Sequence, residues 1–136
     1  MHIFDKRTNR IASVLHDVAC SQIPVANAKL AACIVYKNDI VAVGVNQKKS
    51  HPFQAQYARH AESIYLHAET DAIKNALKVI TVDDLSKSKL FVVRVTKDDK
   101  FAMAKPCVGC MRAIVNFGIR SVFYSTSNDS RAIEQL

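Results

Sequence analysis

Short apolar runs rich in β-branched residues alternate along this chain with segments of helical periodicity. Ile11, Val14, Leu15 and Val18 recur at helical spacing, which predicts a helix over residues 5–21 that Pro24 prevents from continuing much further. By the same reasoning, strands are predicted at 29–36, 40–45, 90–95 and 120–125, and further helices at 67–79 and 106–116. This alternation favours an α/β fold, a three-layer α/β/α sandwich whose mixed sheet carries helices on both faces.

The connections add detail to this prediction. Residues 37–39 predict a tight turn, so the first two strands should form an antiparallel hairpin. The later strands are reached through helices and are therefore expected to be parallel. Residues 46–60 and 97–105 read as polar connections, and Gly118 is expected to end the third helix. The tail after residue 125 is compatible with one short helix or one short strand.

Length and composition place the whole chain in one domain, residues 1–136. Only three Gly and three Pro occur, which excludes collagen-like and mostly disordered chains. No apolar run reaches the length of a membrane span, so no membrane partner is expected. The first ten residues carry four charged side chains and no apolar segment, so no secretory signal is predicted and a cytoplasmic location is expected.

The formal net charge of +7 favours anionic partners such as phosphates or nucleic acid. The basic residues are scattered, and the densest groups are Lys48-Lys49 and Lys87-Ser88-Lys89. Charge distributed in this way is more typical of a solvated surface than of a binding patch. It therefore carries little weight in the choice of a function.

The four cysteines differ in what surrounds them. Cys33 lies inside an apolar run and is expected to be a core residue. Cys20 follows His16 by four residues, a spacing that permits a metal pair on one helix face but more often means a buried thiol. Cys107 and Cys110 form a C-x-x-C, which by itself indicates either a redox pair or half of a structural zinc site.

Two predicted helices begin with groups that bind metals or move protons. His67-Ala68-Glu69 opens one helix, and Pro106-Cys107-Val108-Gly109-Cys110 opens the other. One imidazole and two thiolates suit zinc with an open fourth position, where the metal lowers the pKa of a water to about 7. Thiolates are also favoured at a helix N-terminus. We therefore predict a zinc site made by His67, Cys107 and Cys110. Glu69 would face the water without ligating the metal and would move its proton to a leaving nitrogen.

The H-x-E followed by P-C-x-x-C resembles the zinc-dependent cytidine and deoxycytidylate deaminase superfamily. The resemblance covers about residues 29–126, and Pro106 to Tyr124 is more similar to the deoxycytidylate branch than to the tRNA adenosine branch. It implies a cytidine deaminase-like fold, a zinc cofactor and a homo-oligomer. It also implies that Glu69 protonates ring N3 and deprotonates the attacking water, and that ammonia leaves from C4.

A second H-A-E triplet, His60-Ala61-Glu62, lies seven residues before the first-named one. Either triplet could supply the ligand and the acid/base group, and both would lie on one face of a helix that started early. We choose His67 and Glu69 because a helix with a continuous apolar stripe follows directly.

The expected substrate is a free cytosine nucleotide or nucleoside, with deoxycytidylate first. Val43 to Asn46 resembles the family's G-x-N segment, which implies that Asn46 contacts the sugar or base, and the resemblance assigns the Ala68 backbone N–H to the base. Lys48 and Lys49 follow Asn46 and would bring positive charge near a 5′-phosphate.

Two other functions compete with this one. A nucleic-acid base deaminase acting on tRNA or single-stranded DNA would use the positive charge, but aromatic residues make up only 7% of the chain. A non-catalytic zinc module would leave Glu69 unexplained. Nucleic acid is therefore the less favoured partner.

Overall fold

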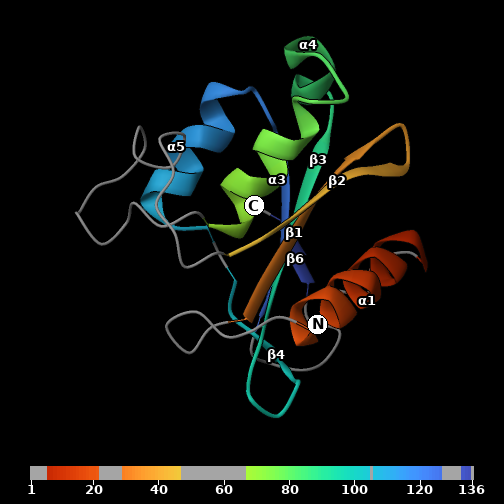
Figure 1. Cartoon of the computed structure of the whole chain (residues 1–136), viewed down its shortest axis with the longest axis vertical. Coiled ribbons are helices and arrows are strands. Elements are labelled where there is room, and N and C mark those ends of the chain that lie inside the picture. Colours follow the sequence, from red (N-terminus) through yellow and green to blue (C-terminus); the bar gives the residue numbers. More distant parts are fainter. Residues whose placement is uncertain (1–5, 22–28, 47–66, 105, 127–132, 136) are drawn as a thin grey trace.

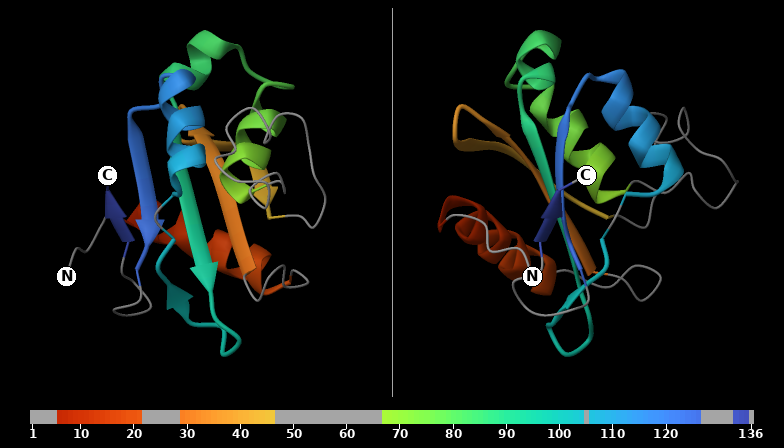
Figure 2. Two further views of the ribbon diagram at one scale, coloured as in Figure 1. Left: turned by 90° about the vertical axis from the view of Figure 1, so that its left-hand side faces the viewer. Right: turned by 180° about the vertical axis from the view of Figure 1, so that it is seen from behind.

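The computed structural model describes residues 6–21, 29–46, 67–104, 106–126 and 133–135. Within these residues, one mixed sheet separates helices on its two faces (Figures 1 and 2). Helix α1 (Lys6–Cys20) covers one face, and α3 (Ala68–Ala76) and α5 (Val108–Asn116) cover the other. The predicted three-layer α/β/α sandwich is confirmed. None of the described helices combines the length and the apolar character that crossing a bilayer requires.

The sheet has the strand order β2-β1-β3-β5-β6, with β4 paired to β3. The strands are β1 (Lys29–Tyr36), β2 (Asp39–Val45), β3 (Lys89–Val95), β4 (Phe101–Ala102), β5 (Ser121–Ser125) and β6 (Ile133–Gln135). Four of them match the predicted strands closely. β4 lies within residues 97–105, which were expected to be a polar connection. In the tail, for which helix and strand were both open, residues 133–135 form the strand β6 antiparallel to β5.

The expectation of parallel later strands is right for one pair and wrong for another. β3 and β5 are parallel, but β3 runs antiparallel to β1, which lies on its other side in the strand order. The reason is the path of the chain from β2 to β3. That connection passes over β1, so β3 runs in the same direction as β2 but is paired with the strand between them.

Burial on both faces explains why the central residues of β1 and β3, 30–35 and 90–93, are continuously apolar instead of alternating. Ala31 and Cys33 of β1 pack on the α1 side, and Ala32 and Ile34 pack on the opposite side. α1 contributes Leu15 and other residues of its apolar stripe to the first of these clusters. Cys33 is fully buried, as predicted for a core residue.

The helices differ from their predicted lengths on one side of the sheet. α3 ends at Ala76, and a second helix, α4 (Val82–Ser86), follows within the connection to β3. Thr81 caps α4 in a capping box in which its side chain accepts from the Asp84 N–H and the Asp84 carboxylate accepts from the Thr81 N–H. This T-x-x-D pattern is the signal that identifies the helix start in the sequence.

The hairpin between β1 and β2 makes a turn that is costly for one of its residues. Lys37 and Asn38 both have positive φ, 52° and 70°, between the paired residues Tyr36 and Asp39. Two positive φ angles characterise the type I′ turn, in which Asn is preferred at the first central position. Lysine is not suited to it, because a left-handed conformation costs an ordinary residue about 1–2 kcal/mol.

We expect Lys37→Asn to raise the free energy of unfolding by about 0.5–1 kcal/mol, part of that conformational cost. Urea denaturation of the two proteins measures the difference. Lys37→Ala is the control, because alanine removes the long side chain but keeps the conformational cost. An equal gain in both variants would contradict the assignment of the strain to this turn.

Candidate active site at the starts of two helices

His67 is the N-cap residue of α3 and leaves its imidazole available. Its backbone is extended, with φ −86° and ψ 159°, and its side chain makes no capping hydrogen bond. The His67 carbonyl instead accepts from the backbone N–H of Asp71 at 2.9 Å and from the hydroxyl of the fully buried Thr70 at 3.1 Å. Sequence reasoning did not identify Thr70. Its side chain helps to hold the start of the helix on which the imidazole is presented.

Cys107 occupies the same position on α5 that His67 occupies on α3. It is the N-cap residue, and its Sγ accepts from the Cys110 backbone N–H at 3.4 Å. Cys110 lies one turn later and is fully buried, whereas Cys107 is exposed. The C-x-x-C spacing therefore places both sulfur atoms at the first turn of one helix, where unpaired N–H groups favour negative charge.

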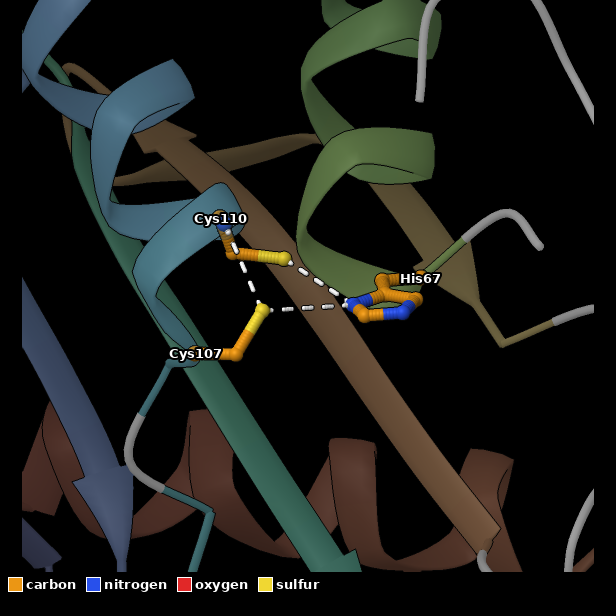
Figure 3. A group of neighbouring side chains, drawn as sticks. All are labelled: His67, Cys107 and Cys110. Atoms are coloured by element: carbon orange, nitrogen blue, oxygen red, sulfur yellow. Dashed lines mark hydrogen bonds between the residues drawn. The ribbon is translucent and has the colours of Figure 1, made fainter. Parts of the chain in front are cut away.

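The two helix starts bring three ligand atoms together from distant parts of the chain (Figure 3). His67 Nδ1 lies 3.2 Å from Cys110 Sγ and 3.6 Å from Cys107 Sγ, and all three atoms lie within 4.8 Å of one another. In a tetrahedral zinc site, bonds of about 2.0–2.1 Å to nitrogen and 2.3 Å to sulfur place a nitrogen and a sulfur ligand about 3.5 Å apart. The spacing of these donors fits zinc.

The donor set also fits zinc chemically. One imidazole and two thiols are the ligand types that zinc prefers, and among the described residues no fourth His, Cys, Asp or Glu joins the group. A site with three protein ligands would leave a fourth position for water, which is the arrangement of catalytic zinc sites.

Without a metal, the pKa values of the two thiols shift in opposite directions. The pKa of Cys107 is lowered to about 4, mainly by a hydrogen bond from Cys110; burial opposes this effect and a hydrogen bond from His67 adds to it. The hydrogen bond to Cys107 raises the pKa of Cys110, as does its burial. The hydrogen bond to Cys107 raises the pKa of His67, which burial opposes. A divalent cation removes this asymmetry, because a coordinating thiol is deprotonated outright.

Glu69 lies in the first turn of α3 and is 4% exposed. Burial raises the pKa of its carboxyl group, while a hydrogen bond from its own backbone N–H and the charge of His67 oppose the rise. A hydrogen bond with the Cys110 thiol also opposes the rise in the pKa of Glu69. A buried carboxyl group in this position can hold a proton and release it.

The residues expected to contact the substrate are only partly described. Ala68 is fully buried at the first position of α3, where a helix N–H has no partner within the helix. Asn46 follows β2, and its side-chain oxygen accepts from the Leu30 backbone N–H at 3.1 Å, a contact with β1 that the sequence did not indicate. Lys48, Lys49 and the triplet His60-Ala61-Glu62 lie outside the described residues.

Residues 5–126 match the family described as the cytidine and deoxycytidylate deaminase zinc-binding region. Among solved structures, dCMP deaminase from the cyanophage S-TIM5 superposes with a TM-score of 0.63 at 19% identity, covering 93% of this chain and 89% of that one. Cytidine deaminase from Burkholderia pseudomallei gives a TM-score of 0.62 at 17% identity, with 98% and 92% covered. These likenesses confirm the cytidine deaminase-like fold.

A third similar structure is larger than this chain. It is a diaminohydroxyphosphoribosylaminopyrimidine deaminase/5-amino-6-(5-phosphoribosylamino)uracil reductase from Thermotoga maritima, with a TM-score of 0.56 at 21% identity. The match covers 88% of this chain but 29% of that one. No curated protein matches the sequence. The matched region is the zinc-binding region of the family, and the match spans most of the chain. This protein therefore belongs to the zinc-binding cytidine and deoxycytidylate deaminase family.

Proposed function

We propose that this protein deaminates the cytosine ring of a free nucleotide or nucleoside, with deoxycytidylate as the first choice. The observation that carries the proposal is the buried Glu69 carboxyl group in the first turn of α3, which interacts with all three residues whose ligand atoms the two helix starts bring together. The reaction consumes one water, replaces the amino group at C4 by oxygen and releases ammonia. A non-catalytic zinc module has no need of a carboxylate in this position.

In this proposal, His67, Cys107 and Cys110 hold the zinc and Glu69 moves the protons. Zinc, when bound, makes a water acidic enough to supply hydroxide near neutral pH. Glu69 accepts the proton of that water, donates a proton to ring N3 and then delivers one to the departing amine. Because Glu69 is buried, its carboxylate acts away from bulk solvent, where a positioned proton donor is most effective.

The choice of a free nucleotide has separate support. The cyanophage S-TIM5 enzyme with the same fold was crystallised in complex with dCMP and dUMP. Asn46 stands at the end of β2, and in our proposal it contacts the sugar or base together with the Ala68 N–H. Lys48 and Lys49 follow it in the sequence and provide positive charge for a 5′-phosphate. We also propose that the enzyme works as a homo-oligomer, which light scattering measures.

We expect dCMP to be deaminated with a kcat/KM about 10- to 100-fold above that of deoxycytidine. The reason is a charge-assisted contact to phosphate, worth about 1.5–3 kcal/mol. Ammonia release from cytidine, deoxycytidine, CMP, dCMP, guanine and a cytosine-containing oligonucleotide tests this expectation. In a variant with Lys48→Ala and Lys49→Ala, the preference for dCMP should fall while turnover of deoxycytidine stays unchanged.

The same panel tests the second candidate function, a nucleic-acid base deaminase, which the net charge of +7 favours. Reaction of the oligonucleotide alone would replace the free-nucleotide proposal by that function. Reaction of the unphosphorylated nucleosides alone would overturn the role of the two lysines and leave the deaminase assignment standing.

A further inference from the structure

Two side chains of helix α3 form hydrogen bonds with the backbone of strand β2. The Val45 N–H donates to Asp71 Oδ2 at 3.0 Å, and Asn75 Nδ2 donates to the Val43 carbonyl at 2.9 Å. Asp71 and Asn75 are four residues apart on the helix, a rise of about 6 Å, and two residues along a strand span about 6.8 Å. The two contacts are therefore in register, like successive bonds between neighbouring strands.

Among the strands that the structure describes, β2 is outermost, with β1 as its one neighbour, so its outer edge needs partners of this kind. The outer backbone groups of such a strand face no neighbouring strand. Val43 and Val45 are two residues apart, so their backbone groups point toward the same edge. At this edge, the Asp71 carboxylate accepts from the Val45 N–H, and the Asn75 amide donates to the Val43 carbonyl.

Gly44, between the two bonded residues, lets the helix come close. A Cβ atom at this position would overlap the backbone nitrogen of Ala72 and the carbonyl oxygen of Ala68, and it would lie 2.8 Å from the Asp71 carbonyl carbon. These are backbone atoms of α3, which cannot rotate away as a side chain can. The separation of α3 from β2 is thus set by the missing side chain, and its position along β2 by the two hydrogen bonds.

The carboxylate of Asp71 is deeply buried but not isolated. Asp71 is 3% exposed, and its Oδ1 forms an ion pair with Lys74 Nζ at 3.4 Å. Removing the carboxylate would leave the Val45 N–H without the acceptor it has now, a larger loss than that of an exposed ion pair. The two oxygens of Asp71 therefore make contacts that can be removed separately: Oδ1 with Lys74 and Oδ2 with the Val45 N–H.

We propose that Asp71, Asn75 and Gly44 form a lock that positions the metal-binding start of α3 relative to the end of β2. Asp71 follows His67 by one helical turn, and its partner Val45 immediately precedes Asn46. The lock thus sets, with one set of contacts, the position of His67 and Glu69 at the start of the helix and of Asn46 just after the strand. Asp71 and Asn75 are positioning residues, and the inference rests on the ligand role proposed for His67.

The test is the zinc affinity of variants at Asp71, measured by competition with a chromophoric chelator. We expect Asp71→Ala to bind zinc about tenfold more weakly, at the low end of the loss seen when outer groups around a metal site are removed. Asp71→Asn keeps an acceptor for the Val45 N–H and should restore most of the affinity. Lys74→Gln, the matched control, breaks only the ion pair and should bind zinc like the wild type.

A second readout separates positioning from stability. Co²⁺ substituted for zinc reports ligand geometry through its visible absorption, and we expect the bands to shift in Asp71→Ala and not in Lys74→Gln. Wild-type affinity and bands in a less stable Asp71→Ala would overturn the lock and leave Asp71 a structural residue. If Asp71→Ala does not fold, Asn75→Ala removes the other bond and must weaken zinc binding in the same direction, or the proposal is wrong.

The failure of the lock can be told apart from the failure of the ligand assignment. If His67→Ala binds zinc as tightly as the wild type, the proposed ligand set is wrong and the lock has no site to position. If His67→Ala loses zinc while Asp71→Ala and Asn75→Ala do not, only the lock is wrong.

Discussion

Glu69→Gln is expected to keep the fold and the bound zinc but to lose turnover by at least about 100- to 10,000-fold, the range for general acid–base catalysis. The amide has the shape of the carboxyl group but cannot accept a proton and return it. The proposed reaction asks Glu69 to do this more than once, since the water, ring N3 and the leaving amine all exchange protons with it. The loss should therefore fall on kcat.

Ammonia release and zinc content, measured on the same preparation, check this result. Glu62→Gln is the matched control, because it makes the same change in the other H-A-E triplet. It should leave turnover near the wild-type value. Near-normal turnover in Glu69→Gln would remove Glu69 from the mechanism, and a large loss confined to Glu62→Gln would move the acid/base role to the earlier triplet.

His67→Ala is expected to abolish stable zinc binding, whereas His60→Ala keeps one zinc per chain. His67 Nδ1 lies near both cysteine sulfur atoms, so its loss leaves two ligands, too few for a stable site. Elemental analysis after dialysis measures the stoichiometry. Retention of zinc in His67→Ala and its loss in His60→Ala would show that the earlier triplet supplies the ligand.

The same pair of variants has a second readout in the free energy of unfolding. A metal that binds only the folded protein stabilises it by about 4 kcal/mol when its free concentration is 1,000 times Kd. Added zinc should raise the unfolding free energy of the wild type and of His60→Ala by this order, and that of His67→Ala by far less. Equal stabilisation of all three would place the zinc elsewhere.

Local sequence patterns were sufficient to predict most of the helices and strands. The apolar stripe of α1 and the β-branched runs of β1 and β3 predicted those elements almost to the residue, because periodicity reflects which faces are buried. Local patterns also placed His67 and Cys107 at helix starts, where both are N-cap residues. The helix α4 was missed although its capping box is visible in the sequence, since its five residues are too few for a clear apolar period.

Sheet order could not be obtained in the same way. Whether β3 pairs with β2 or with β1 depends on where the connecting helix crosses, and no local signal encodes that choice. The antiparallel pairing of β1 with β3 and of β6 with β5 joins separate segments of the chain. For these features, the free energy of burying distant residues together decides, not the preference of any one segment.

The candidate active site also combines features that the local sequence determines with features that depend on how distant elements pack. The sequence by itself determined the ligand types, their spacing within each motif and the carboxylate two residues after the histidine, because a single helix start sets all of these. Only the tertiary structure decided that His67 meets sulfur atoms 40 and 43 residues away, and that its Nδ1 is the nitrogen facing them. It also buried Glu69 and tied Asp71 to Val45. Contacts between separate elements depend on how closely those elements pack, and at α3 and β2 that distance is set by the missing side chain of Gly44.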